Sequence, residues 1–169
     1  MKLDYSKGLY WQMLNLNLSW DEYITFINEP KHLVNPIRDV ILFENPFLEL
    51  FTKSPWWLIP IAYILPYFFH MMNNECDLTT TILLHIIGVI NWTLFEYLIH
   101  RFFFHSEDYW LPNHPIVLAH HFLLHGIHHA FPMDRYRLVL PPIVGYALYF
   151  FLIFTPIKAI APAFYFDAM

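Results

Sequence analysis

The chain has 169 residues, of which 57% are hydrophobic, 20% aromatic and only 14% charged, so it is too apolar for an ordinary soluble domain. Its formal net charge of −5 offers no basic surface to a nucleic acid, and its single cysteine, Cys76, excludes an internal disulfide and a thiolate metal cage. At this length one domain is expected. The 11 histidines stand out in so apolar a chain, because imidazole is a common metal ligand.

The first 54 residues mix charged side chains with Trp, Tyr and Phe. They contain no continuous apolar core of the kind that marks a secretory signal, so we expect the mature protein to begin near Met1. Charged and aromatic residues together are typical of the level of the lipid headgroups. We therefore predict that residues 1–54 are a cytosolic or interfacial, partly helical segment without chemistry of its own.

Residues 55–169 have the composition of a membrane-embedded domain. Residues 56–72 and 80–99 form two apolar runs, each near the roughly 20 residues that a helix needs to cross a bilayer. A third apolar region, either one long span or a bent pair of short ones, extends from residue 138 and is interrupted by Pro156, Lys158 and Pro162. We predict an all-α integral membrane protein with a transmembrane helical hairpin and a third membrane segment.

The basic flanks of the hairpin predict its orientation. Lys53 precedes the first run and Arg101 follows the second, whereas the loop between the runs, NNECDLT, has no Lys or Arg. The positive-inside rule then places the N-terminus and residues 100–137 in the cytosol, with the latter forming a His-rich helical cap. The alternative is a soluble all-α protein with buried apolar helices, which adjacent runs of this length and low charge disfavour.

Histidine is concentrated in one part of the chain. Eight of the 11 histidines fall within residues 100–129, where an even distribution would place about two: His100, His105, His114, His120, His121, His125, His128 and His129. At about 100° per residue, the four at 121, 125, 128 and 129 lie on one face of a helix. His100 and His105 differ by about 140° and can serve one site only at a helix end or in a cleft.

These spacings predict a metal site. Neutral imidazole suits Zn, Cu, Fe and Ni, and two His-rich segments supply at least five nitrogens, more than a four-coordinate structural zinc takes. The surplus implies two metal ions, and a redox-active pair is the most useful at a membrane surface. The spacing does not separate iron from zinc. His32, His70, His85 and His114 are interpreted as structural side chains.

Three further side chains are candidates for orienting the ligands through hydrogen bonds. His121 belongs to the His-rich face, and Glu96 lies one turn before His100 inside the apolar run, where an acid is a functional candidate. Asp134 follows the His-rich region and could orient a ligand histidine or bind a substrate group. Ordinary polar contacts explain Glu96 and Asp134 equally well.

Three strings carry a resemblance to a known family. EYLIHRFFFH, HFLLHGIHH and PMDRYRLVLPP together resemble the fatty acid 2-hydroxylases of the membrane fatty acid hydroxylase/sterol desaturase superfamily. The resemblance implies a dimetal centre of two iron ions, with zinc possible in preparations. By the same resemblance, the metal ligands are His100, His105, His125, His128 and His129.

The resemblance also implies an activity and its setting. It implies a multi-pass enzyme of the endoplasmic-reticulum membrane that uses dioxygen and two electrons to hydroxylate carbon 2 of a long-chain fatty acyl group destined for sphingolipids. Many members carry a haem domain with a His-Pro-Gly-Gly motif, which this chain lacks, so a separate cytochrome b5 is the expected electron donor.

Alternatives remain open at this point. The family continues past the third membrane region into further His motifs, so we expect the chain to be the N-terminal part of a hydroxylase. A desaturase or sterol oxidase of the same superfamily would use the same histidines. An inactive truncated membrane protein that acts as a binding partner is the alternative from a different class.

Overall fold

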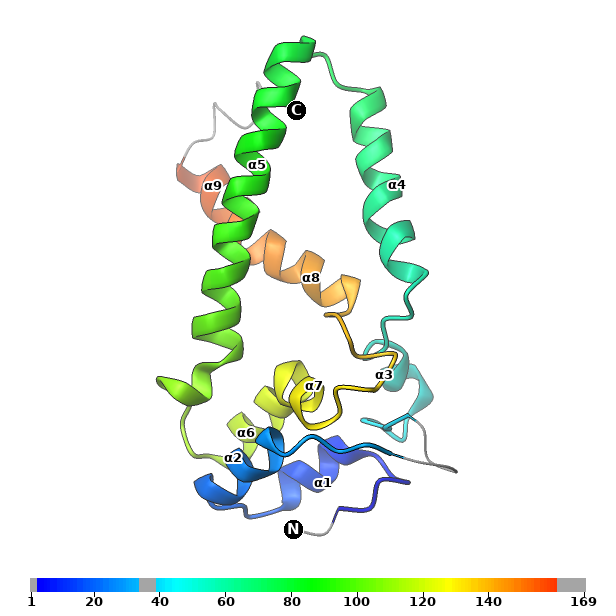
Figure 1. The fold of residues 1–169 in the computed structure, drawn as a ribbon, viewed down its shortest axis with the longest axis vertical. Helices are drawn as coiled ribbons and strands as arrows, with labels where there is room; N and C mark the ends of the chain where they lie inside the picture. The colour runs from blue at the N-terminus through cyan, green and yellow to red at the C-terminus, as the bar shows by residue number, and fades with distance from the viewer. Residues whose placement is uncertain (1–2, 34–38, 161–169) are drawn as a thin grey trace. The chain divides into compact units, whose positions relative to one another are not determined.

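The computed structural model describes residues 3–33 and 39–160, and the regular structure within these ranges is entirely helical (Figure 1). The predicted all-α class is confirmed for these residues. In chain order the elements are α1 (Leu9–Asn15), α2 (Trp20–Asn28), α3 (Pro46–Leu50), α4 (Leu58–Met72), α5 (Leu78–Ile99), η1 (His100–Phe104), η2 (Ser106–Asp108), α6 (Pro115–His121), η3 (Phe122–Gly126), α7 (Ile127–Ala130), α8 (Pro142–Tyr149), η4 (Phe150–Phe154) and α9 (Thr155–Ile160). The elements η1, η3 and η4 are π-helical turns, and η2 is a 3₁₀ turn.

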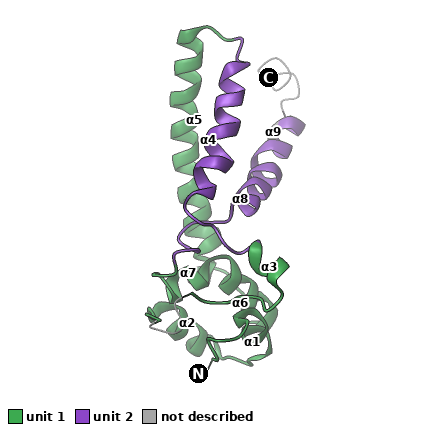
Figure 2. Ribbon diagram, turned by 90° about the vertical axis from the view of Figure 1, so that its right-hand side faces the viewer, with its two compact units in different colours: residues 1–50, 76–134 green, residues 51–75, 135–169 purple. Residues whose placement is uncertain are grey.

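The chain forms two compact units (Figure 2). Unit 1 comprises residues 1–50 and 76–134, and unit 2 comprises residues 51–75 and 135–169. The division into an interfacial segment, residues 1–54, and a membrane-embedded domain, residues 55–169, stays a prediction. The N-terminal segment shares a unit with the His-rich region because its helices carry apolar faces that pack there.

The core of unit 1 is built by short helices from the two ends of that unit. Helix α1 packs on α6, and α2 packs on α7 (Figure 1). Tyr23, Ile27 and Phe122 are almost completely buried between them, and burial of side chains of this size stabilises a fold by roughly 1.5–3 kcal/mol each. The start of α1 is tied to the segment that follows residue 39 by the hydrogen bond from Leu9 N to the Ile41 carbonyl (2.9 Å).

The ends of the core helices follow from local sequence. Ser19 caps α2 and forms a capping box with Glu22, in which the Ser19 backbone N–H donates to the Glu22 carboxylate (2.9 Å). The His114 side chain caps α6 and accepts from Ile116 N (3.3 Å), while Pro115 occupies the first helical position. His114 therefore has the structural role that the sequence predicts for an isolated histidine.

Two helical runs are long and apolar enough to cross a membrane, Leu78–Phe104 and Pro142–Ile160. The first joins α5 to η1, begins at the Asp77 cap, and has no residue of its most apolar window buried. A helix that is apolar on all sides and unburied is stable in lipid rather than in water. These two runs therefore indicate a membrane protein, and the first contradicts the alternative of buried helices in a soluble protein.

The first predicted membrane segment is shorter than expected. Helix α4 has 15 residues, which at 1.5 Å per residue is roughly 22 Å, less than the roughly 30 Å of a hydrocarbon core. It starts after a turn at residues 55–57 and ends at Asn73. The third region is one helical run through η4 up to Ile160. Pro162, which was expected to interrupt it, lies outside the described residues.

Within unit 2, α4 and α8 are in contact through aromatic residues. The rings of Tyr63 and Tyr146 lie 5.4 Å apart, and the Tyr146 hydroxyl donates to the Ala62 carbonyl. A β-carbon at Gly145 would lie 2.7 Å from the Tyr63 hydroxyl oxygen, so any larger residue there would displace the Tyr63 side chain. Near the start of the unit, Arg137 is buried and donates to the Thr52 hydroxyl (3.1 Å).

Gly126 permits the close approach of α2 to the His-rich helices. A β-carbon there would lie 3.0 Å from the Tyr23 hydroxyl oxygen and 3.2 Å from Ile27 Cγ2, and overpacking of this kind costs about 1–3 kcal/mol. We expect Gly126→Ala to lower the thermal unfolding midpoint in detergent. The control is Gly88→Ala in α5, where nothing lies within 4 Å, so that the midpoint should stay the same or rise. Equal midpoints for both variants would contradict the packing role.

Candidate metal centre

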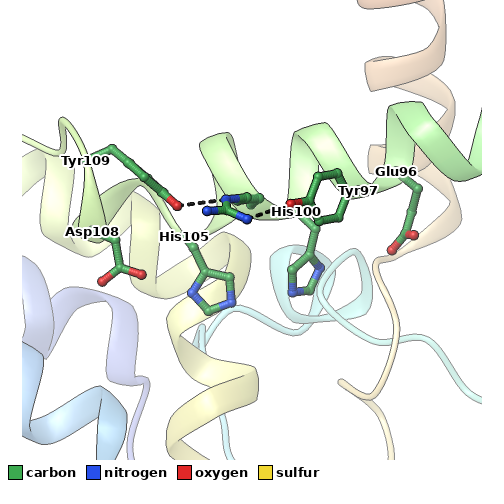
Figure 3. A pocket seen from close by; sticks show the side chains of 7 residues that line it. Glu96, Tyr97, His100, His105, Asp108 and Tyr109 are labelled. Atoms are coloured by element: carbon green, nitrogen blue, oxygen red, sulfur yellow. Dashed lines mark hydrogen bonds between the residues drawn. The ribbon is translucent and has the colours of Figure 1, made fainter.

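A π-helical turn brings His100 and His105 together. The His105 backbone N–H donates to the His100 carbonyl (3.0 Å), which closes a turn with an i→i+5 hydrogen bond. In such a turn, residues five apart are neighbours, as residues four apart are in an α-helix. The ring centroids are 5.1 Å apart, and both rings project to the same side (Figure 3). The separation of about 140° between His100 and His105 that an ideal α-helix would give is therefore not present, because the π turn brings the two rings to the same side.

His125 and His129 complete a group of four converging rings, which we call the imidazole cluster: His100, His105, His125 and His129. His125 Nε2 lies 3.4 Å from His105 Nε2 and 2.9 Å from His129 Nε2. One nitrogen from each of His100, His105 and His125 fits within 4.8 Å of the others. The His128 ring lies at the edge of the cluster, 6.1 Å from His125 and 5.9 Å from His129 between ring centroids.

His121 does not join the cluster, although an ideal helix places it on the same face. The π turn η3 begins directly after it and changes the angle between His121 and His125. Its Nδ1 lies 2.5 Å from the Tyr23 hydroxyl, and its Nε2 lies 2.8 Å from the Phe104 carbonyl. Both ring nitrogens are thus engaged within the protein, which fits an orienting role and not a ligand role.

Glu107 is a residue of the site that the sequence reasoning missed. Its carboxylate lies between two histidines, with Oε1 3.0 Å from His105 Nδ1 and Oε2 2.8 Å from His121 Nε2. The His121 N–H is aligned on the Phe104 carbonyl, so Oε2 has an electrostatic contact and no aligned donor among the described residues. The signal available in the sequence was an acid two residues after a candidate ligand, inside the His-rich region.

The charge of Glu107 is set by opposing effects. Burial disfavours the charged form, but contacts with His121, with its own backbone N–H and with His105 outweigh it and lower the pKa of Glu107 to about 2. The carboxylate is therefore ionised at neutral pH. Tyr23 is shifted the other way, because burial and then the charge of Glu107 raise the pKa of its hydroxyl above the ordinary value.

The other predicted orienting residues lie in different surroundings. Glu96 lines an open pocket of about 490 Å³ together with Tyr97, His100, Arg101, His105, Asp108 and Tyr109 (Figure 3). Within the described residues no hydrogen bond joins the Glu96 carboxylate to His100, its expected partner. Asp134 is buried and accepts from the Val40 backbone N–H (3.3 Å), which ties two segments of unit 1 together.

Arg101 has a fixed position at the pocket. Its Nε donates to the Tyr109 hydroxyl (2.9 Å) and one terminal nitrogen donates to the Tyr97 hydroxyl (2.6 Å), as the dashed lines in Figure 3 show. His120, by contrast, is directed back to its own helix, with Nδ1 2.7 Å from the Ile116 carbonyl. Its Nε2 lies 3.4 Å from the Tyr10 hydroxyl of α1, so both contacts of His120 are structural and lie outside the cluster.

The imidazole cluster is suited to hold a transition metal. Burial, followed by the nearby His129, His100 and His105, lowers the pKa of His125 to about 3, and burial together with His105 also lowers the pKa of His129. The rings of His125 and His129 are therefore neutral at pH 7 and have lone pairs available. Metal–nitrogen bonds of about 2.0–2.1 Å place two ligand nitrogens of one ion roughly 3–4 Å apart. The separations of 2.9 and 3.4 Å are close to this spacing.

His125 should make the metal-free chain sensitive to acid. Because its folded-state pKa of about 3 lies below the ordinary 6.5, the unfolded state binds a proton that the folded state does not. The stability that depends on neutral His125 is complete above about pH 6.5 and is lost as the pH falls toward 3, by about 1.4 kcal/mol per unit. We expect the unfolding midpoint of the chelator-treated chain to fall when the pH is lowered from 7.5 to 5.0. The His125→Asn substitution should make this fall smaller. An equal fall of the unfolding midpoint in the unsubstituted chain and in His125→Asn would contradict the expectation.

Comparisons with known proteins place this geometry in a family. No family model matches the chain. The ceramide very long chain fatty acid hydroxylase SCS7 of Saccharomyces cerevisiae is 43% identical over 143 residues, which cover 83% of this chain and 36% of that protein. The dihydroceramide fatty acyl 2-hydroxylase FAH2 of Arabidopsis thaliana is 36% identical, over 83% of this chain and 56% of its own length. The fatty acid 2-hydroxylase of Rattus norvegicus is 32% identical, over 90% of this chain and 44% of its own length.

A solved structure gives the same relationship. Full-length scs7p, of which only the hydroxylase domain is visible, superposes with a TM-score of 0.83 at 39% identity, over 95% of this chain and 60% of that one. The chain spans between 36% and 56% of the length of these three curated relatives. By sequence and by fold, the chain belongs to the fatty acid 2-hydroxylase family.

Proposed function

We propose that the protein is a metal-dependent fatty acid 2-hydroxylase that acts on long-chain acyl groups of sphingolipids. The observation that carries the proposal is the convergence of four imidazoles at the end of an apolar helix, in a chain whose relatives are named for this reaction. The reaction inserts one oxygen atom of O₂ into the C–H bond at carbon 2. The second oxygen atom takes up two electrons and two protons and leaves as water.

The ligands proposed for two metal ions are His100, His105, His125, His128 and His129, of which the first three and His129 converge. Iron is the proposed metal, and zinc is the ion expected to replace it in preparations. A redox-active pair, when bound, supplies the capacity to reduce dioxygen and oxidise an aliphatic C–H bond, which no side chain provides. The contribution of the protein is a set of converging rings and a fixed position for the acyl chain.

The pocket on the α5–η1 side offers the substrate a place beside the cluster. Two of its walls are the candidate ligands His100 and His105. Arg101 is a donor held in place by two tyrosines, and Glu96 and Asp108 are acceptors. A polar acyl headgroup can form hydrogen bonds there, while its apolar tail lies along the exposed apolar side chains of α5.

The proposed setting is the endoplasmic-reticulum membrane, with α4 and α5 as a hairpin and the His-rich end in the cytosol. Lys53 and Arg101 at the outer flanks support this orientation. The proposed electron donor is cytochrome b5, because the side chains of the described residues do not supply electrons. Donor and cluster would then meet on the cytosolic side.

The activity can be tested by lipid analysis. In cells that lack their own 2-hydroxylase, expression of the protein should raise 2-hydroxy fatty acids measured by mass spectrometry, and His125→Ala should abolish the increase because the central ring of the cluster is lost. The matched control is His120→Ala, whose ring contacts its own helix, and which should retain the product. Unchanged product in His125→Ala would refute the site, and new double bonds in place of hydroxyl groups would favour a desaturase.

Metal content provides a second test. Elemental analysis of the purified wild-type chain should find iron or zinc, up to two ions per chain, and His125→Ala should reduce the content. The reduction is expected because the His125 ring lies against all three other rings of the cluster, those of His100, His105 and His129. A wild-type chain without bound metal would favour the alternative of an inactive membrane protein that acts as a binding partner.

A further inference from the structure

We propose that Glu107 is a positioning residue, which fixes the tautomer and ring orientation of His105, and that His121 and Tyr23 hold it in place from behind. The inference rests on the proposed function, because it assumes that the imidazole cluster binds a metal. It extends the site beyond the histidines to a buried chain of contacts that begins in the N-terminal segment. That segment was expected to have no chemistry of its own.

The first step concerns His105. An ionised carboxylate can only accept, so the 3.0 Å contact between His105 Nδ1 and Glu107 Oε1 requires the proton of the ring to lie on Nδ1. The lone pair is then on Nε2, the atom that faces His125 Nε2 at 3.4 Å. Glu107 thus selects the one neutral tautomer of His105 that can donate a lone pair into the cluster.

The second step concerns the support of Glu107. Its side chain is only 6% exposed, and that of His121 is 4% exposed. His121 approaches the carboxylate with Nε2 at 2.8 Å while donating to the Phe104 carbonyl. This carbonyl belongs to Phe104, whose ring stacks on the His125 ring with 5.1 Å between the ring centroids and 17° between the ring planes. The backbone of η1 and the carboxylate are therefore held by one imidazole.

The third step reaches helix α2. With the His121 proton on Nε2, its Nδ1 must accept, and the buried Tyr23 hydroxyl is the donor at 2.5 Å. Tyr23 has no exposed surface, so no water replaces this donor. Helix α2 thereby determines the tautomer of His121, His121 supports Glu107, and Glu107 determines the tautomer of His105.

The test uses Co²⁺ as a spectroscopic probe of the metal-free protein in detergent. We expect Glu107→Gln to weaken Co²⁺ binding by about 10–100-fold, as is typical when the carboxylate partner of a ligand histidine is lost, and to change the d–d spectrum. Tyr23→Phe, which keeps the ring and removes the hydroxyl, should weaken binding by a smaller factor. The matched control is Glu75→Gln, the same change at an exposed position before α5, which should bind as the wild type does.

A metal-free measurement separates positioning from folding. In ¹⁵N-histidine spectra of the chelator-treated protein, His105 should show the Nδ1–H tautomer in the wild type and lose it in Glu107→Gln, with helicity unchanged. Wild-type Co²⁺ affinity and spectrum in a folded Glu107→Gln protein would overturn the positioning role alone. Failure of the wild type itself to bind Co²⁺ would refute the metal centre of the proposed function, and the inference with it.

Discussion

The crowding of imidazoles is the constraint on which the rest of the structure depends. Two ring nitrogens at 2.9 Å, His125 Nε2 and His129 Nε2, are held together either by a shared proton or by a shared cation. Burial keeps the rings of His125 and His129 neutral, and it also removes the water that would otherwise solvate them. A scaffold that maintains this arrangement must be rigid on all sides. The π turns, the glycine at position 126 and the buried carboxylate of Glu107 each contribute to that rigidity.

Much of the architecture could be predicted from composition and periodicity. The all-α class, the long apolar runs and the concentration of histidines within residues 100–129 follow from residue types and spacing, because helices and metal ligands both have strong local signatures. The grouping of His100 and His105 with His125 and His129 was implied by the family resemblance and not by the spacing. The π turns could not be predicted, since a wider turn of the helix depends on tertiary contacts and leaves no residue signature. They explain why His105 lies nearer to His100, and His121 farther from the cluster, than an ideal helix implies.

Long-range contacts account for the remaining differences. Glu107 looks like an ordinary surface acid in the sequence, and its role arises only when α6 delivers His121 to it from 14 residues away in the chain. The same holds for Tyr23, which meets His121 across 98 residues. Asp134 lies within the string PMDRYRLVLPP but contacts the Val40 backbone. Helix packing decided these positions, and single-residue patterns carry little information about it.

The contact between Tyr23 and His121 also has a topological consequence. Two side chains that touch must lie on the same side of a bilayer, so the number of crossings between residues 23 and 121 is even. Where the run Leu78–Phe104 makes one crossing, another must precede it, and α4 is the apolar helix described in that stretch. A helix of only 15 residues that crosses the bilayer thins the bilayer around itself.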